Sequence, residues 1–71
     1  MAEFRYLQTG TLFSLDKLKF IKINNNLDTL FVTKEELPHY SSNCFCLENQ
    51  HYCTILPTIK VKIIKSSEMF H

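Results

Sequence analysis

The side chains best able to do chemistry in this 71-residue chain lie in one short stretch, "NCFCLENQHYC", at positions 43–53. The stretch holds all three cysteines and one of the three histidines, namely Cys44, Cys46, His51 and Cys53. Thiolates and imidazoles bind zinc, a thiol beside an imidazole can act as a nucleophile, and two thiols can form a disulfide. Free cysteines also pack as small apolar side chains in protein cores. We therefore weigh four interpretations of this stretch.

The spacing of these residues predicts a β-hairpin with its turn at positions 48–49. In this register Cys44 faces Cys53 across the hairpin, and Cys46 faces His51. Because successive residues of a strand point to opposite faces, the four candidate ligands share one face. Three cysteines and one histidine are a common ligand set for structural zinc.

The flat register of the hairpin opposes tetrahedral coordination of zinc by these four side chains. Directly opposed Cβ atoms lie about 5 Å apart, and residues two apart on one strand lie about 6.5 Å apart, so the ligands form a rectangle. His39 offers an alternative fourth ligand from a distant segment. We expect no cofactor, and we keep a zinc-stabilised structural or oligomerisation module as an alternative, with Cys44, Cys46, His51 and Cys53 as ligands.

Core packing is the interpretation that the pattern favours, because free cysteines are among the most buried residues in proteins. On this interpretation the cysteine face looks inward and continues to Ile55, while Phe45 and Tyr52 form an aromatic pair on the outer face. The reverse assignment buries Phe45, Leu47 and Tyr52 instead.

The same residues offer little to catalysis. Cys53 has His51 two positions away, but no glycine-rich or helix-start segment supplies an oxyanion hole.

The chain has no signal-peptide pattern at its start and no apolar run of the ~20 residues that a membrane helix needs. We therefore expect a cytoplasmic, non-enzymatic protein without a membrane partner. In that reducing compartment a Cys44–Cys53 disulfide is sterically allowed but disfavoured.

A second feature of the sequence is the clustering of its lysines. Six of the eight basic residues lie at positions 17–22 and 60–65, and neither segment contains an acid. Lysines that share one side of a domain bind phosphates or acidic proteins, and lysines on a sheet edge also keep it from pairing with other chains. The sequence predicts a binding surface on the following residues: Lys19, Lys22, Lys60, Lys62, Glu35 and Glu36.

The segments that carry these residues have the pattern of short strands. The composition, 45% hydrophobic and 21% charged, is typical of a globular domain, which we place at residues 3–66 with a frayed tail at 67–71. "IKVKIIK" at 59–65 alternates β-branched residues with lysines, which predicts a strand. Further strands are expected at 4–8, 11–15, 19–23 and 29–32, and in the hairpin at 43–53.

Turn residues complete the predicted fold. Gly10 is expected at a turn with positive φ. Thr33 and Glu36 have the spacing of a capping box, and Pro38 stops extension, so we expect one short helical turn near 34–37. Together these elements predict an all-β protein, a small SH3-like or OB-like curved sheet or barrel of about 5–7 short strands.

The first third of the chain carries a family resemblance. "YLQTGTLFSLDKLKFIKIN" at 6–24 resembles the start of small phage-encoded proteins, in which a Leu-x-x-Gly-Thr-hydrophobic-Phe segment leads into a strand, a tight turn and an aromatic-Ile-Lys strand. "ILPTIKVKII" at 55–64 suits the closing strand of those compact β-barrels. The chain departs from this pattern in its cysteine-rich middle and in having no glycine at residues 16–17.

The resemblance implies a small accessory protein of a phage or mobile element, which acts in the host cytoplasm by binding a host macromolecule. It carries over no functional residue. We therefore expect a non-enzymatic binding module that docks on a host protein and inhibits it, by electrostatic complementarity or strand addition. The alternatives are a nucleic-acid-binding barrel that uses the same lysines, and the zinc-stabilised or homo-oligomeric module.

Overall fold

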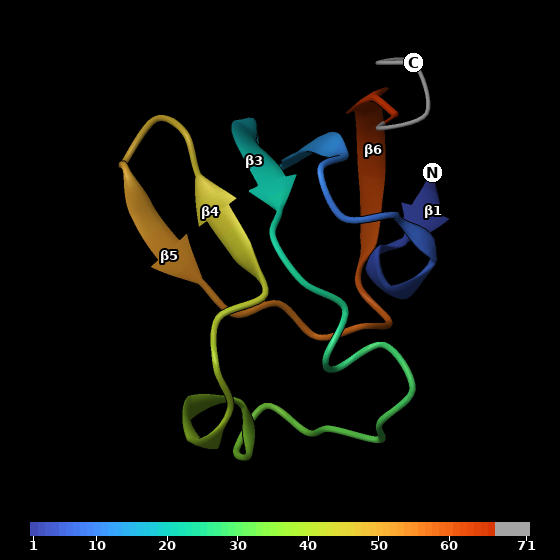
Figure 1. Ribbon diagram of the computed structural model, residues 1–71, viewed down its shortest axis with the longest axis vertical. Helices are drawn as coiled ribbons and strands as arrows, with labels where there is room; N and C mark the ends of the chain where they lie inside the picture. Colours follow the sequence, from blue (N-terminus) through green and yellow to red (C-terminus); the bar gives the residue numbers. More distant parts are fainter. Residues whose placement is uncertain (67–71) are drawn as a thin grey trace.

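A computed structural model describes residues 1–66, which form one six-stranded antiparallel sheet in the order β1-β6-β2-β3-β4-β5 (Figure 1). The strands are β1 (Ala2–Glu3), β2 (Leu12–Leu15), β3 (Leu18–Lys22), β4 (Cys44–Cys46), β5 (His51–Cys53) and β6 (Lys60–Lys65). The helical elements of the described residues are two 3-10 turns, η1 (Phe4–Tyr6) and η2 (Leu37–His39). No helix of the described part could span a membrane. The predicted all-β class is confirmed.

The β2–β3 hairpin has a two-residue turn at Asp16 and Lys17, both of which have positive φ, 51° and 67°. Two successive residues of this kind give the turn a twist that matches the twist of the flanking strands. Asparagine and aspartate adopt positive φ more readily than most other residues. Lys17 also adopts it here, although it lacks the conformational freedom of glycine. Gly10, which precedes β2, has a φ of 94°, so its predicted turn conformation is also confirmed.

The β4–β5 hairpin has the predicted register. Cys44 is the Cα partner of Cys53, Phe45 is that of Tyr52, and Cys46 is that of His51. The cysteine face looks inward, as core packing requires, since Cys44 and Cys46 are both buried.

Two predicted strands are wrong. Residues 4–8 begin with η1, because the backbone N–H groups of Phe4 and Arg5 donate to the carbonyls of Ile59 and Pro57 while the chain turns the Phe4 ring into the core. Residues 29–32 form a turn region and not a strand, since the N–H of Leu30 bonds back to the carbonyl of Leu27.

The predicted helical turn is present, but it lies further along the chain than expected. The 3-10 turn η2 covers Leu37–His39, with Pro38 in its first turn, where a missing N–H is tolerated. Thr33 still organises the approach, because its carbonyl accepts the N–H groups of Glu36 and Leu37.

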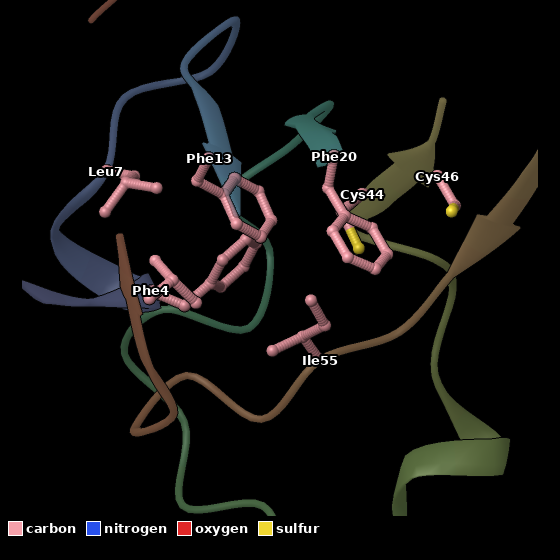
Figure 2. Close-up of a cluster of buried hydrophobic side chains, with 8 residues drawn as sticks. Phe4, Leu7, Phe13, Phe20, Cys44, Cys46 and Ile55 are labelled. Carbon is pink, nitrogen blue, oxygen red and sulfur yellow. The ribbon is translucent and has the colours of Figure 1, made fainter. Parts of the chain in front are cut away.

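The hydrophobic core lies on one face of the sheet (Figure 2). Its centre is a row of three aromatic rings, in which Phe13 contacts Phe4 edge-on at 5.2 Å and stacks on Phe20 at 5.4 Å between centroids. The buried apolar cluster consists of Phe4, Leu7, Phe13, Phe20, Cys44, Cys46, Ile55 and Val61.

The segment between β5 and β6 passes over this core and is fixed by one asparagine. The buried Asn43 side chain donates from Nδ2 to the carbonyl of Ile55 at 2.8 Å and accepts the N–H of Ile55 on Oδ1 at 2.9 Å. The side-chain amide of Asn43 thus bonds to the Ile55 backbone as a neighbouring strand would, at a point where the strand pairing has ended. The strand order has β1 and β5 as its two ends, with no pairing between them over the described residues. The predicted frayed tail, residues 67–71, lies outside the described residues.

Candidate functional site

The face of the sheet opposite the core carries a continuous row of apolar side chains, which we call the outer ladder: Leu12, Ile21, Phe45 and Tyr52. Each is the direct cross-strand partner of the next, so the row crosses β2, β3, β4 and β5. Successive side chains of a strand point to opposite faces of the sheet. Because Phe13 and Phe20 point into the core, their neighbours Leu12 and Ile21 point to the outer face. The ladder therefore has no covering layer of described core residues.

The outer ladder is most exposed at its end on the edge strand β5. Leu12, Ile21 and Phe45 are partly buried, whereas Tyr52 is 64% exposed. The rings of Phe45 and Tyr52 meet edge to face, with centroids 5.0 Å apart. A T-shaped pair of this kind fixes both rings, so the exposed aromatic surface is held in one orientation.

A polar row runs beside the outer ladder on the same face. Ser14 is the cross-strand partner of Lys19 on one side and of Lys62 on the other, so these three residues form a lysine row across β3, β2 and β6. Both lysines are exposed. Ser14 is two residues from Leu12, which separates the two rows by about 6–7 Å along the strand. The sheet thus presents an apolar strip with ammonium groups along one side.

Lys60 is also exposed, two residues before Lys62 on β6. Its cross-strand partner is Glu3 of β1, which forms an ion pair with Arg5 at 2.9 Å. Lys60 therefore lies at the end of the sheet away from the outer ladder, beside a charge-paired edge.

Lys22 was expected on the binding surface, and this expectation is wrong. Its side chain is fully buried, on the same face of β3 as Phe20. The Nζ atom donates to the carbonyls of Phe4 and Leu7 at 3.1 and 2.7 Å and to Oδ2 of Asp28 at 2.7 Å. It also lies 4.6 Å from the centre of the Phe4 ring. All three of its protons are used inside the protein, so Lys22 has none to offer a partner.

The buried Lys22–Asp28 pair anchors a long loop, residues 24–42, to the sheet. Next to Asp28, the side chain of Leu27 is buried as well. The two ends of the loop are joined by Asn24, whose Nδ2 donates to the carbonyl of Ser42 at 2.6 Å. A loop closed at its base in this way can hold its tip in a defined place.

The acidic residues of the predicted surface belong to this loop. Glu35 and Glu36 are both exposed, and Oε1 of Glu36 accepts a hydrogen bond from Thr33 Oγ1 at 3.2 Å. They lie outside the sheet that carries Lys19 and Lys62 (Figure 1). The six residues predicted to share one surface are therefore divided between the sheet face, the core and the loop.

Sequence reasoning missed two exposed features. The outer ladder could have been found by extending the alternation of the cysteine hairpin to the neighbouring strands. Phe31, in the long loop, is fully exposed, and no pattern signalled it because residues 29–32 resembled a strand.

The thiols of the cysteine face differ in environment. Burial, together with the neighbouring Cys53 and Cys46 thiols, raises the pKa of Cys44 from 9.0 to about 12. Cys53 lies partly exposed on β5, with His51 Nε2 3.6 Å from its Sγ, and burial raises its pKa as well. A lowered thiol pKa favours a nucleophilic cysteine, and burial shifts the pKa of both these thiols in the opposite direction.

The predicted metal ligands are not arranged as a site over residues 1–66. Cys44 and Cys46 belong to the buried cluster (Figure 2). His51, by contrast, is exposed on β5. No three histidine, cysteine or acidic side chains of the described residues come together as a metal-binding group. Zinc binding stays a prediction that metal analysis of the purified protein would check.

Comparison with known proteins gives this chain no relative. No protein-family model, no curated protein and no solved structure matches it.

Proposed function

We propose that this protein is a small non-enzymatic binding module that docks on another protein through the outer face of its sheet. The observation that carries the proposal is the outer ladder, a row of four apolar side chains across four strands that the core leaves uncovered. An aromatic and aliphatic centre with charged residues at its rim is the usual composition of a protein interface. Tyrosine is also one of the residues that most often dominate binding energy.

The lysine row defines the chemistry of the partner. Lys19 and Lys62 lie on the same side of the outer ladder, so the partner should present carboxylates beside an apolar strip. Electrostatic contacts of exposed lysines are screened by salt. Binding should therefore weaken as the ionic strength rises, while the apolar part of the interface remains.

The resemblance to phage accessory proteins extends the proposal to a host protein as the partner. A module of 71 residues can inhibit such a protein by covering a surface that it needs for another interaction. Phage origin and inhibition are both part of this proposal.

Nucleic acid is the competing partner for the same face, because Tyr52 could stack on a base beside lysines. The charge of the chain favours a protein. Its sequence pI is about 7.7, below the strongly basic values typical of nucleic-acid-binding domains. Its one arginine, Arg5, pairs with Glu3.

Affinity capture followed by binding measurements tests the proposal. The tagged full chain is used to capture partners from host lysate, and a captured protein is then purified and titrated against variants. Tyr52→Ala should weaken its binding at least about tenfold, as loss of a central aromatic residue does. Lys19→Glu/Lys62→Glu should weaken it mainly at low salt.

Matched controls come from exposed residues off the outer face. Phe31→Ala and Lys34→Glu, both in the long loop, should leave the affinity unchanged. Equal affinity of wild type and Tyr52→Ala would contradict the proposal. Retardation of single-stranded oligonucleotides that Tyr52→Ala abolishes would assign the face to nucleic acid. A concentration-dependent dimer that Tyr52→Ala abolishes would assign it to a second copy of the chain.

A further inference from the structure

Cys44 and Cys53 are direct partners across the β4–β5 hairpin. Directly opposed residues of antiparallel strands have Cα atoms about 4.5–5.5 Å apart, which is within the range that a disulfide spans. The Cys44 side chain already points towards β5, because its Sγ donates to the carbonyl oxygen of Cys53 at 3.4 Å. A bond between the two sulfurs would therefore need little movement of the backbone.

The two thiols differ in access. Cys44 lies on β4, inside the sheet, and is fully buried. Cys53 lies on the end strand β5, is partly exposed, and has His51 Nε2 at 3.6 Å from its Sγ. An external reagent would therefore reach Cys53 first, and His51 is placed to accept its proton.

We propose that Cys44 and Cys53 form a redox-responsive pair, which closes to an intramolecular disulfide when the protein meets a small-molecule disulfide such as oxidised glutathione. Cys53, after losing its proton, attacks one sulfur of the glutathione disulfide and releases one glutathione thiolate. Cys44, after losing its proton, attacks Sγ of Cys53 and releases the second glutathione. Two protein thiols are oxidised by two electrons, and one glutathione disulfide is reduced to two thiols, which take up the two protons.

The reaction should be slow. The raised pKa of both thiols leaves little thiolate at neutral pH, and exchange depends on the thiolate fraction. We expect closure on the scale of hours. The pair does not depend on the docking proposal, since its side chains lie on the opposite face of the hairpin from Phe45 and Tyr52.

The experiment incubates the full-length protein with a reduced and oxidised glutathione mixture, quenches it with acid and alkylates the remaining thiols. Cleavage after Glu48 separates the peptide with Cys44 and Cys46 from the peptide with Cys53, and chymotryptic cleavage after Phe45 separates Cys44 from Cys46. We expect the wild type to lose two hydrogen atoms, to retain no glutathione, and to yield a peptide in which Cys44 is joined to Cys53.

Two variants assign the roles. Cys46→Ser should close as the wild type does, whereas Cys44→Ser should stop with one glutathione retained on Cys53. The same incubation in denaturant should scatter the bond among the three thiols, because the fold no longer selects a pair. A native wild type that keeps glutathione on Cys53, joins Cys46 to Cys53, or remains fully reduced would overturn the proposal.

Discussion

Lys19 and Lys22 lie on one strand, β3, yet they have opposite roles. Lys19 is exposed on the outer face beside the apolar ladder, whereas Lys22 is buried on the inner face and bonded to two carbonyls and a carboxylate. The difference follows from an odd separation of three residues, since a strand repeats every two. The same residue type thus stabilises the fold on one face and remains available for a partner on the other.

The two faces of the sheet differ in the same way throughout. The inner face holds aromatic rings in mutual contact, and the outer face holds a row of apolar side chains that solvent still reaches. Substitutions on the inner face should therefore lower stability, and substitutions on the outer face should change binding.

The largest effect on stability is expected from Phe13→Ala. Phe13 is fully buried and its ring contacts both Phe4 and Phe20, so its loss leaves a cavity at the centre of the core. We expect the free energy of unfolding, measured by urea titration, to fall by about 4 kcal/mol. Phe31→Ala is the matched control, because that ring is fully exposed, and it should change stability by less than about 0.5 kcal/mol. Similar losses for the two variants would break the distinction between buried and exposed aromatics.

The next largest effect is expected from Asp28→Ala. This change leaves the buried Lys22 ammonium without its anionic partner, and it releases the anchor of the long loop. Unfolding titrations should report a loss of about 3 kcal/mol. Glu35→Ala, which removes an exposed carboxylate of the same loop, should stay within about 0.5 kcal/mol of wild type. An unchanged stability for Asp28→Ala would mean that the ion pair does not hold the loop.

A third effect concerns pH and the inner face of the hairpin. Burial raises the folded-state pKa of Cys44 from 9.0 to about 12, so the native protein keeps a proton that the unfolded chain loses above pH 9. The stability contributed by the neutral thiol is complete below pH 9 and is lost as the pH rises towards 12. Between pH 8 and pH 10 we expect this to lower the free energy of unfolding by about 1 kcal/mol.

Cys44→Ala separates this contribution from every other effect of pH on stability. The variant should be less stable at every pH, and its decline from pH 8 to pH 10 should be shallower than that of the wild type. Parallel declines would show that Cys44 does not stay neutral in the folded protein.

The smallest effect on stability is expected from Tyr52→Ala. The change removes an edge-to-face contact with Phe45 from a ring that is 64% exposed. A loss of about 0.5–1 kcal/mol should follow. Thermal unfolding of Tyr52→Ala and Phe13→Ala side by side gives the comparison, and a Tyr52→Ala loss as large as that of Phe13→Ala would place the outer ladder in the core.

Local patterns in the sequence predicted the hairpins well. The cysteine hairpin register and the strands expected at 11–15 and 19–23 depend on residues close together in the chain, and alternation then assigned the cysteines to the inner face. The burial of Lys22 followed from the same alternation, but the clustering of lysines along the chain favoured a shared surface. The ion pair of the buried Lys22 with Asp28 could not be predicted. Nothing in the sequence around Asp28 indicates that the chain brings this residue back to β3.

Contacts between distant segments were beyond sequence reasoning. Phe4 leaves the extended conformation because backbone bonds from the segment before β6 draw it into the core, and these partners are more than fifty residues away. The long loop was assigned a strand at 29–32 from its β-branched and aromatic residues, yet none of the strands within residues 1–66 pairs with it. For the same reason the exposure of Phe31 had no predictor in the sequence.

The central claim, that the outer face and not the long loop contacts the partner, can be tested most directly by site-specific photo-crosslinking. A photoreactive phenylalanine analogue is placed at Tyr52 in one protein and at Phe31 in another, and both replace an exposed aromatic ring by a similar one. Each protein is irradiated with the purified captured partner. We predict a covalent adduct from position 52 that excess unlabelled wild type prevents, and none from position 31. An adduct from position 31 without one from position 52 would contradict the account.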